Sequence, residues 1–401
     1  MSDIIVIGAG ASGLVAAIFA KSENNNVTIL ERFDKSAKKI LVTGNGRCNY
    51  WNEDFDNKHF YSSNNSFINS INTPDNKEEV LNFFKSIGII PTIKNGYYYP
   101  MSKEASSVRL ALLNEIKKKN INIINNSNVI DIKKVDNKFQ ITCSDKLYAC
   151  DKVIVATGSN AYYKEENLGY SICNKLGHNI IKVMPSLVQL VGKESYFKEW
   201  AGVRNNSEVS IYVDNNLEKK ELGELMLTDY GLSGICIFNL SGIANRSLNL
   251  NKKVSIKINF LPEIDNLKEF LEDRNKTLND RPLDLFLEGL LNYKLINVIL
   301  KRINLLDRYY SNLNDNEKNL LIDSLTNFNV EITGSKSFSD SQVCTGGVDT
   351  KEIDPNTFES LICKNLYIVG EVLDVDGDCG GYNLGFAWLS GMIAGKCVRN
   401  D

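Results

Sequence analysis

Glycines near the N-terminus carry the clearest chemical signal in this sequence. The run Gly8-Ala9-Gly10-Ala11-Ser12-Gly13 has the spacing GxGxxG and directly follows the apolar stretch Ile4–Ile7. In this pattern the first glycine permits a tight turn and the second lets the backbone approach a pyrophosphate. The third glycine lets a helix pack closely on a strand. We therefore expect this run to hold the phosphates of a dinucleotide.

The residues around these glycines supply the elements that a phosphate site needs. Ile4–Ile7 is typical of a buried parallel strand, residues 14–21 of a helix, and Val27–Leu30 of a second strand. The helix N-terminus offers unpaired N–H groups and a positive dipole end to phosphates. Glu31, which precedes Arg32, can accept hydrogen bonds from an adenosine ribose. This order favours a dinucleotide site over a structural glycine turn.

A further strand in the middle of the chain returns to the expected sheet. Val153–Val155 is apolar and β-branched, and short strands with polar turns precede it between residues 121 and 150. This order is typical of a parallel sheet with an added β-meander. The residues expected to line the dinucleotide site here are Val129, Ala156, Thr157 and Gly158.

The C-terminal region contains a second set of residues suited to a flavin. Leu366–Val369 reads as a strand that runs into a Gly-Glu pair, and a helix is expected from about residue 384 to residue 398. The N-terminus of that helix can stabilise the negative charge that a flavin ring gains on reduction. Since no second GxGxxG with a following helix and strand occurs, we expect one FAD. The expected contacts are Gly370, Glu371, Asp376, Gly381, Tyr382, Asn383 and Leu384.

The other reactive side chains point away from metal and hydrolytic chemistry. Nine cysteines lack a CxxC pair, which fits reduced thiols better than disulfides or structural zinc. Asp374, Asp376 and Asp378 lack the glycine and terminal glutamate of a calcium loop. We interpret His178 as a structural turn residue and His59 as a solvated side chain, so we expect no metal site and no histidine catalysis.

Composition excludes other classes of function. The net charge of -3 gives no basic surface for nucleic acid, and no run of about 18 apolar residues predicts a membrane span. The N-terminus lacks the features of a signal peptide. We expect a soluble cytoplasmic protein with a small-molecule substrate and neither a nucleic-acid nor a membrane partner; the oligomeric state stays open.

The segment Lys39–Asn49 (KILVTGNGRCN) resembles the signature of the BaiN-like and aminoacetone-oxidase-like FAD-binding flavoproteins. The resemblance continues at residues 96–108, 225–234, 344–348 and 370–395. It implies an α/β fold with a glutathione-reductase-like FAD-binding Rossmann domain, formed by residues 1–186 and 336–401. An inserted β-barrel-like domain would span residues 187–335, with a helical part at about 262–327.

The resemblance also implies that residues of this segment contact the cofactor: Lys39, Gly44, Asn45, Gly46, Arg47, Cys48 and Asn49. It implies an oxidoreductase that transfers a hydride at the flavin N5, either by reducing an enone C=C bond or by oxidising an amine, with NAD(P)H as a possible external donor. The alternative is an FAD-binding module that acts on RNA or on a partner protein, and a third option is a tRNA-modifying flavoprotein that uses folate. The catalytic residues stay open, with Arg47, Cys48 and Tyr382 as candidates.

Some of these residues have competing interpretations. For Cys48 we favour a packed side chain over a reactive thiolate, and for Arg47 contact with the cofactor or its phosphates. Tyr97–Tyr99 is an aromatic run more typical of a core or edge strand than of a substrate pocket. The sequence departs from the family pattern at residues 158–170 and at Cys236, which leaves the substrate and the local loops open.

Overall fold

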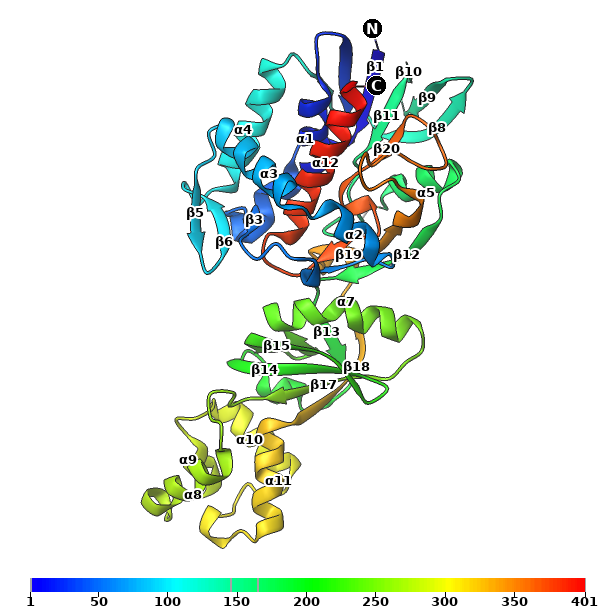
Figure 1. Ribbon diagram of the computed structural model, residues 1–401. Coiled ribbons are helices and arrows are strands. Elements are labelled where there is room, and N and C mark those ends of the chain that lie inside the picture. Colours follow the sequence, from blue (N-terminus) through cyan, green and yellow to red (C-terminus); the bar gives the residue numbers. More distant parts are fainter. Residues whose placement is uncertain (1, 145, 164–165, 401) are drawn as a thin grey trace. The chain divides into compact units, whose positions relative to one another are not determined.

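The computed structural model describes residues 2–144, 146–163 and 166–400 (Figure 1). The chain divides into two compact units, one formed by residues 1–184 with 343–401 and the other by residues 185–342. Each unit has its own cluster of buried apolar side chains. The chain returns to the first unit at residue 343, shortly after a turn at Phe338–Asp340. The sequence suggests this return at residue 336.

A parallel sheet of five strands forms the centre of the first unit. Ile4 in the middle strand lies opposite Lys152 on one side and Val27 on the other. Both faces are covered, which explains why these short strands are almost continuously apolar. In spatial order the strands are β20 (Leu366–Ile368), β11 (Lys152–Val155), β1 (Ser2–Ile7), β2 (Asn25–Leu30) and β7 (Asn122–Ile124).

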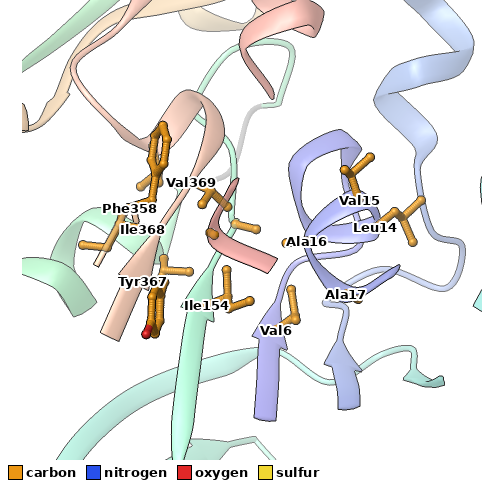
Figure 2. Close-up of a cluster of buried hydrophobic side chains, with 14 of the residues drawn as sticks. Val6, Leu14, Val15, Ala16, Ala17, Ile154, Phe358, Tyr367, Ile368 and Val369 are labelled. Carbon is orange, nitrogen blue, oxygen red and sulfur yellow. The ribbon is translucent and has the colours of Figure 1, made fainter. Parts of the chain in front are cut away.

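Helices from opposite ends of the chain pack together on one face of this sheet (Figure 1). They are α1 (Ala11–Ala20) and α12 (Tyr382–Asn400). A Cβ atom at Gly391 would overlap the carbonyl oxygen of Ser12, and one at Gly395 would overlap that of Ala16. The small face of α12 thus allows close contact with α1. Figure 2 shows Val6 and Ile154 of the sheet beside α1, close to Ile368 of β20.

Smaller elements complete the first unit. The expected meander is present as an antiparallel sheet, and further pairs of strands bring distant parts of the chain together. The meander consists of β8 (Val129–Val135), β9 (Lys138–Cys143) and β10 (Leu147–Cys150). The other strands are β3 (Trp51–Asn52), β4 (Phe60–Tyr61), β5 (Pro91–Lys94), β6 (Tyr97–Pro100), β12 (Ile180–Ser186), β19 (Val343–Val348) and β21 (Asp376–Gly377). The helices are α2 (Asn65–Ile71), α3 (Pro74–Ser86), α4 (Ala105–Lys118) and α5 (Leu168–Lys175).

The second unit is a closed six-stranded barrel with a helical part. Alternate residues of its strands are buried, as in Val254–Asn259, where one face fills the barrel. In spatial order the strands are β13 (Leu190–Gly192), β16 (Gly231–Ser233), β15 (Asn216–Leu227), β14 (Arg204–Val213), β17 (Val254–Asn259) and β18 (Phe328–Ser335). The helices are α6 (Phe197–Trp200), α7 (Ile235–Asn249), α8 (Leu267–Leu278), α9 (Leu283–Leu287), α10 (Tyr293–Arg302) and α11 (Asp315–Thr326). Among the described residues of the chain, no helix combines the length and apolar character needed to cross a membrane.

Candidate functional site

The glycine run forms an open turn between β1 and α1. Gly8 has a φ of 103°, and a Cβ atom there would overlap the carbonyl oxygen of Ala156. A Cβ atom at Gly10, in contrast, would meet no atom within 4 Å. No side chain caps the N-terminus of α1, so its first N–H groups have no side-chain hydrogen-bond partner there. The turn therefore fits a pyrophosphate, as the residues Ala11, Ser12 and Gly13 at the start of the helix suggest.

Glu31 is buried and holds the turn in place. Its Oε2 accepts a hydrogen bond of 2.7 Å from the N–H of Ala9, and its Oε1 accepts one of 2.9 Å from the N–H of Phe33. A carboxylate oxygen has two lone pairs, so each oxygen can still accept a bond from a ribose hydroxyl. Glu31 thus has a structural role that the sequence pattern did not indicate, besides the role expected for it.

Two other residues expected to bind the cofactor, Arg32 and Val129, lie near Glu31. The guanidinium of Arg32 lies over the rings of Phe33 and Tyr163, at 4.5 and 5.0 Å from their centroids. The N–H of Ser127 donates a hydrogen bond of 2.8 Å to the carbonyl oxygen of Glu31. This bond brings the start of β8, and with it the buried residue Val129, next to the end of β2.

The turn after β11 is narrow and polar. The N–H of Ala156 donates to the carbonyl oxygen of Ile7 at 2.9 Å, which joins this turn to the end of β1. The hydroxyl of Thr157 is buried and has no hydrogen-bond partner in the described part of the chain. Asn167 donates to the carbonyl oxygen of Gly158 and so closes the loop that departs from the family pattern. Residues 164–165 of that loop lie outside the described residues.

An ion pair joins the expected flavin segment to the Gly-Glu turn. Lys39 Nζ lies 2.8 Å from Glu371 Oε2, and Glu371 Oε1 accepts a hydrogen bond from the N–H of Cys344. Gly370 has a φ of 74°, and a Cβ atom there would overlap the hydroxyl of Ser12. The structure therefore brings Lys39, Gly370 and Glu371 together beside the start of α1.

The loop that follows Lys39 is mostly exposed. Gly44, Asn45 and Gly46 have φ values of 55°, 54° and 80°, so the chain turns in the left-handed region. Arg47 is exposed and makes no ion pair with the described residues, whereas Cys48 is completely buried. Burial raises the pKa of the Cys48 thiol to about 12, which disfavours a thiolate.

The same loop ends against the N-terminus of α12. A Cβ atom at Gly381 would come within 2.9 Å of Asn49 Oδ1, and that oxygen is buried without a partner among the described residues. Gly380 and Gly381 have φ values of 130° and 96°. A Cβ atom at Gly380 would lie 2.8 Å from the ring of Tyr97. Residues 39–49 thus extend from Glu371 to the start of α12.

Asn383 and Asp376 shape the turn that precedes α12. The side chain of Asn383 accepts a hydrogen bond of 2.9 Å from the N–H of Gly377 and donates one of 2.8 Å to its carbonyl oxygen. Its amide therefore holds the turn. Asp376 is buried and pairs with Tyr61 where β21 meets β4. Tyr382 is buried as well, whereas Leu384 is partly exposed.

The structure bears on three further interpretations from the sequence, those of the two histidines and of the tyrosine run. The expectation that His59 is solvated is wrong, because its side chain is only 22% exposed and lies between two carboxylates. The pairing of β4 with β21 brings it there across a long sequence separation. Tyr97–Tyr99 belongs to β6, which is the central strand of its small sheet and not an edge. His178 is buried between Glu352 and Ser360, in the structural position that we expected.

Three kinds of group in this region suit FAD: the glycines, the buried polar atoms without a hydrogen-bond partner among the described residues, and the helix termini. The open surface at Gly10 and the uncapped start of α1 fit phosphates, and the turn at Gly370 lies next to them. The buried oxygens of Thr157, beside Gly169, and of Asn49, beside Gly381, have no hydrogen-bond partner among the described residues. No group of three or more metal-ligating side chains occurs in the described part of the chain.

Known proteins match the chain over nearly its whole length. Residues 2–397 match the family described as HI0933-like protein Rossmann domain. A 3-dehydro-bile acid delta(4,6)-reductase of Clostridium scindens is 34% identical over 406 residues, which cover 99% of each chain. A ribosomal RNA dihydrouridine synthase of Escherichia coli is 28% identical over 393 residues, 97% of this chain and 96% of that protein.

A solved structure confirms the fold. The 3-ketosteroid-delta4-(5alpha)-dehydrogenase of Rhodococcus jostii RHA1, in complex with 4-androstene-3,17-dione, aligns with a TM-score of 0.50. The alignment covers 100% of this chain and 97% of that one, at 13% sequence identity. The chain therefore belongs to the HI0933-like family of Rossmann-domain proteins and is an FAD-dependent oxidoreductase.

Proposed function

We propose that this protein uses one non-covalently bound FAD to reduce a C=C bond conjugated to a carbonyl group in a small organic substrate. The observation that carries the proposal is the 34% identity, over 99% of both chains, to a reductase of 3-dehydro bile acids. The arrangement of α1, the Gly370-Glu371 turn and the start of α12 supports it, because these elements would offer FAD contacts at several points along its length.

The protein would contact FAD at its adenosine end, at its flavin end and along the phosphates and ribityl chain between them. Residues 8–13 would bind the pyrophosphate and Glu31 the adenosine ribose, while Gly370 and Glu371 would contact the ribityl chain. Residues 44–49 and the start of α12 would border the flavin ring. When bound, FAD supplies the hydride that the reaction needs. The positive end of the α12 dipole would stabilise negative charge at the ring.

The exposed side of the loop at residues 41–47 favours an amphipathic substrate. Leu41 and Val42 are 38% and 45% exposed, although both are large apolar side chains. Arg47 is close in sequence and is not engaged in an ion pair with the described residues. A substrate with an apolar body and one anionic group would cover Leu41 and Val42 with the former and pair with Arg47 through the latter. A steroid acid has this combination.

Dihydrouridine formation in RNA is a second candidate. Relatives from Escherichia coli and Haemophilus influenzae, 28% and 27% identical to this chain, bear that name. Reducing uridine also saturates a C=C bond conjugated to a carbonyl, so the same chemistry would serve both substrates. The lower identity and the net charge of -3 favour the small substrate. Amine oxidation receives no support from these relatives.

The test is a half-reaction with each substrate. The purified holoprotein is reduced without oxygen, by NAD(P)H as the proposed external donor or otherwise by dithionite, and mixed with a 3-oxo-Δ4 bile acid. We expect the flavin absorbance at about 450 nm to return and the product to gain two hydrogen atoms. Recovery with unmodified ribosomal RNA but not with the bile acid would replace the proposal by the second candidate.

A further inference from the structure

Tyr97 and Tyr99 lie on one face of a small antiparallel sheet, and Tyr98 lies on the other. All three belong to β6, the central strand between β3 and β5 (Figure 1). Successive side chains of a strand point to opposite faces of a sheet. The ring of Tyr98 meets the ring of buried Tyr50 edge-on, with centroids 6.3 Å apart. The face that carries Tyr98 therefore packs on the core, and Tyr97 and Tyr99 belong to the opposite face.

The rings of Tyr97 and Tyr99 each lie beside a glycine close to the proposed position of the flavin ring. A Cβ atom at Gly44 would lie 3.6 Å from Cε1 of Tyr99, which is an ordinary contact distance. A Cβ atom at Gly380 would lie only 2.8 Å from Cε1 of Tyr97. The amide of Asn52, in the neighbouring strand β3, donates a hydrogen bond of 2.8 Å to the carbonyl oxygen of Gly380. This sheet thus adjoins both the loop after Lys39 and the turn that leads into α12.

The hydroxyl of Tyr99 is suited to bind an oxygen atom of a substrate. The side chain of Tyr99 is partly exposed and makes no hydrogen bond to the described residues. A phenol hydroxyl can donate one hydrogen bond, and a side chain on a packed strand is held more precisely than one on a loop. The strand pairs on both sides, where Thr92 lies opposite Tyr99 and Trp51 lies opposite Tyr98. The hydroxyl is therefore available, and its ring is anchored, before a substrate binds.

Reduction of a C=C bond conjugated to a carbonyl group requires such a donor. When a hydride adds to the β-carbon, the π electron pair of the C=C bond shifts and the carbonyl oxygen gains the negative charge of an enolate. Water then supplies the proton that the α-carbon takes up, and the C=O bond forms again. The substrate has gained one hydride and one proton, so no further reactant is needed. A donor aimed at the oxygen stabilises the enolate while it exists.

We propose that Tyr99 is a catalytic residue that donates a hydrogen bond to the carbonyl oxygen of the substrate. This role rests on the proposed function and on the proposed placement of the flavin ring beside residues 44–49. Arg47 of the same loop is proposed to pair with the anionic group of the substrate, so the carbonyl group needs a separate donor. Tyr99 is close to Gly44 of that loop and has its hydroxyl unused among the described residues.

The kinetic test compares two tyrosines of the same strand. FAD-bound Tyr99→Phe and Tyr98→Phe are reduced without oxygen and mixed with a 3-oxo-Δ4 bile acid, and the return of the oxidised flavin spectrum is followed. We expect Tyr99→Phe to slow this reoxidation on the order of 100-fold, because loss of one such donor has effects of this size. Tyr98→Phe, whose ring lies on the other face, should react as fast as the unchanged protein. Equal rates in Tyr99→Phe and Tyr98→Phe would overturn the role of Tyr99.

A spectroscopic measurement detects the hydrogen bond without turnover. The oxidised FAD-bound protein is mixed with the same bile acid labelled with ¹³C at the carbonyl carbon, and infrared difference spectra give the C=O stretching frequency. A donated hydrogen bond weakens the C=O bond, so we expect a lower frequency in the unchanged protein and in Tyr98→Phe than in Tyr99→Phe. A low frequency that persists in Tyr99→Phe and is lost in Arg47→Gln would assign the contact to Arg47 and overturn the proposal.

The two measurements also separate this role from the proposed function. If the unchanged protein neither binds nor reduces the bile acid, the proposed function fails and the role of Tyr99 fails with it. If the unchanged protein reduces the bile acid and the C=O frequency is the same in Tyr99→Phe, the proposed function stands and only the role of Tyr99 is rejected.

Discussion

At the scale of single residues, the buried thiol of Cys48 shows how position decides chemistry. Cysteine next to arginine is a common setting for a reactive thiolate. Here the backbone turns at φ 58° and directs the side chain into the core, while Arg47 is exposed. The thiol therefore has the raised pKa of a buried group and packs against its neighbours.

We accordingly predict that Cys48→Ser leaves catalysis intact. Serine is similar in size, and the hydroxyl of Thr43, which contacts the thiol, can bond to the new hydroxyl. The expected change in kcat of the FAD-bound protein is less than threefold, with a loss of about 1 kcal/mol in unfolding free energy because a polar group is buried. A collapse of turnover in a variant that retains FAD would assign Cys48 a catalytic role.

Gly10 allows a sharper test of the phosphate turn. Valine at this position meets no protein atom within 4 Å of its Cβ, so the fold should be retained, but its side chain would occupy the path of the pyrophosphate. We expect Gly10→Val to lose FAD, measured as the flavin content of the purified protein. Gly334 in β18 is equally open and lies in the other unit. Gly334→Val should keep its FAD; equal FAD content in both variants would rule out this placement.

His178 gives the protein a defined dependence on pH. Its folded pKa lies below the usual 6.5, so below pH 6.5 the unfolded chain binds a proton that the folded chain does not. The contribution to stability is complete above pH 6.5 and declines as the pH falls towards the folded pKa. Urea unfolding at pH 7.5, 6.0 and 5.0 should show a smaller loss of stability for His178→Gln than for the unchanged protein. Parallel losses would show that other groups cause the acid sensitivity.

At the scale of elements, the contact between α1 and α12 joins the two halves of the proposed FAD site. Gly391 faces the backbone of Ser12, and backbone cannot move aside as a flexible side chain can. We predict that Gly391→Ala destabilises the first unit by about 1–3 kcal/mol, because the two helices must separate. Thermal unfolding measures the loss, with Gly334→Ala as the control. An unchanged unfolding temperature would mean that the helices tolerate the wider spacing.

Elements made of neighbouring residues are also those that the sequence predicts well. The glycine turn, its flanking strands and the two terminal helices follow from local patterns of apolar and small residues. The burial of His59 depends instead on the pairing of β4 with β21, and the hydrogen bonds of the Asn383 amide depend on a turn that this pairing helps to shape. Polar composition around His59 indicates solvent exposure only when no distant segment covers it. The spacing of residues in the sequence does not indicate contacts with such distant segments.

At the scale of the whole molecule, each unit has a separate hydrophobic core. The residues proposed to bind FAD all lie in the first unit, within residues 1–184 and 343–401. Ligand binding stabilises only the structure that binds it, by RT ln(1 + [L]/Kd). FAD should therefore stabilise the first unit against unfolding and leave the barrel almost unchanged.

This expectation can be measured in the full chain. At a free FAD concentration 100 times Kd, the unfolding free energy of the first unit should rise by about 2.7 kcal/mol. This rise appears as a higher transition temperature for that unit. Trp51 and Trp388 lie in that unit and Trp200 in the other. The fluorescence of a variant that keeps only Trp51 and Trp388 therefore follows the first unit, and that of a variant that keeps only Trp200 follows the barrel. The tryptophan of the barrel should report the same transition with and without FAD. If both transitions rise equally, the units unfold as one cooperative structure, and the barrel depends on the cofactor through its coupling to the first unit.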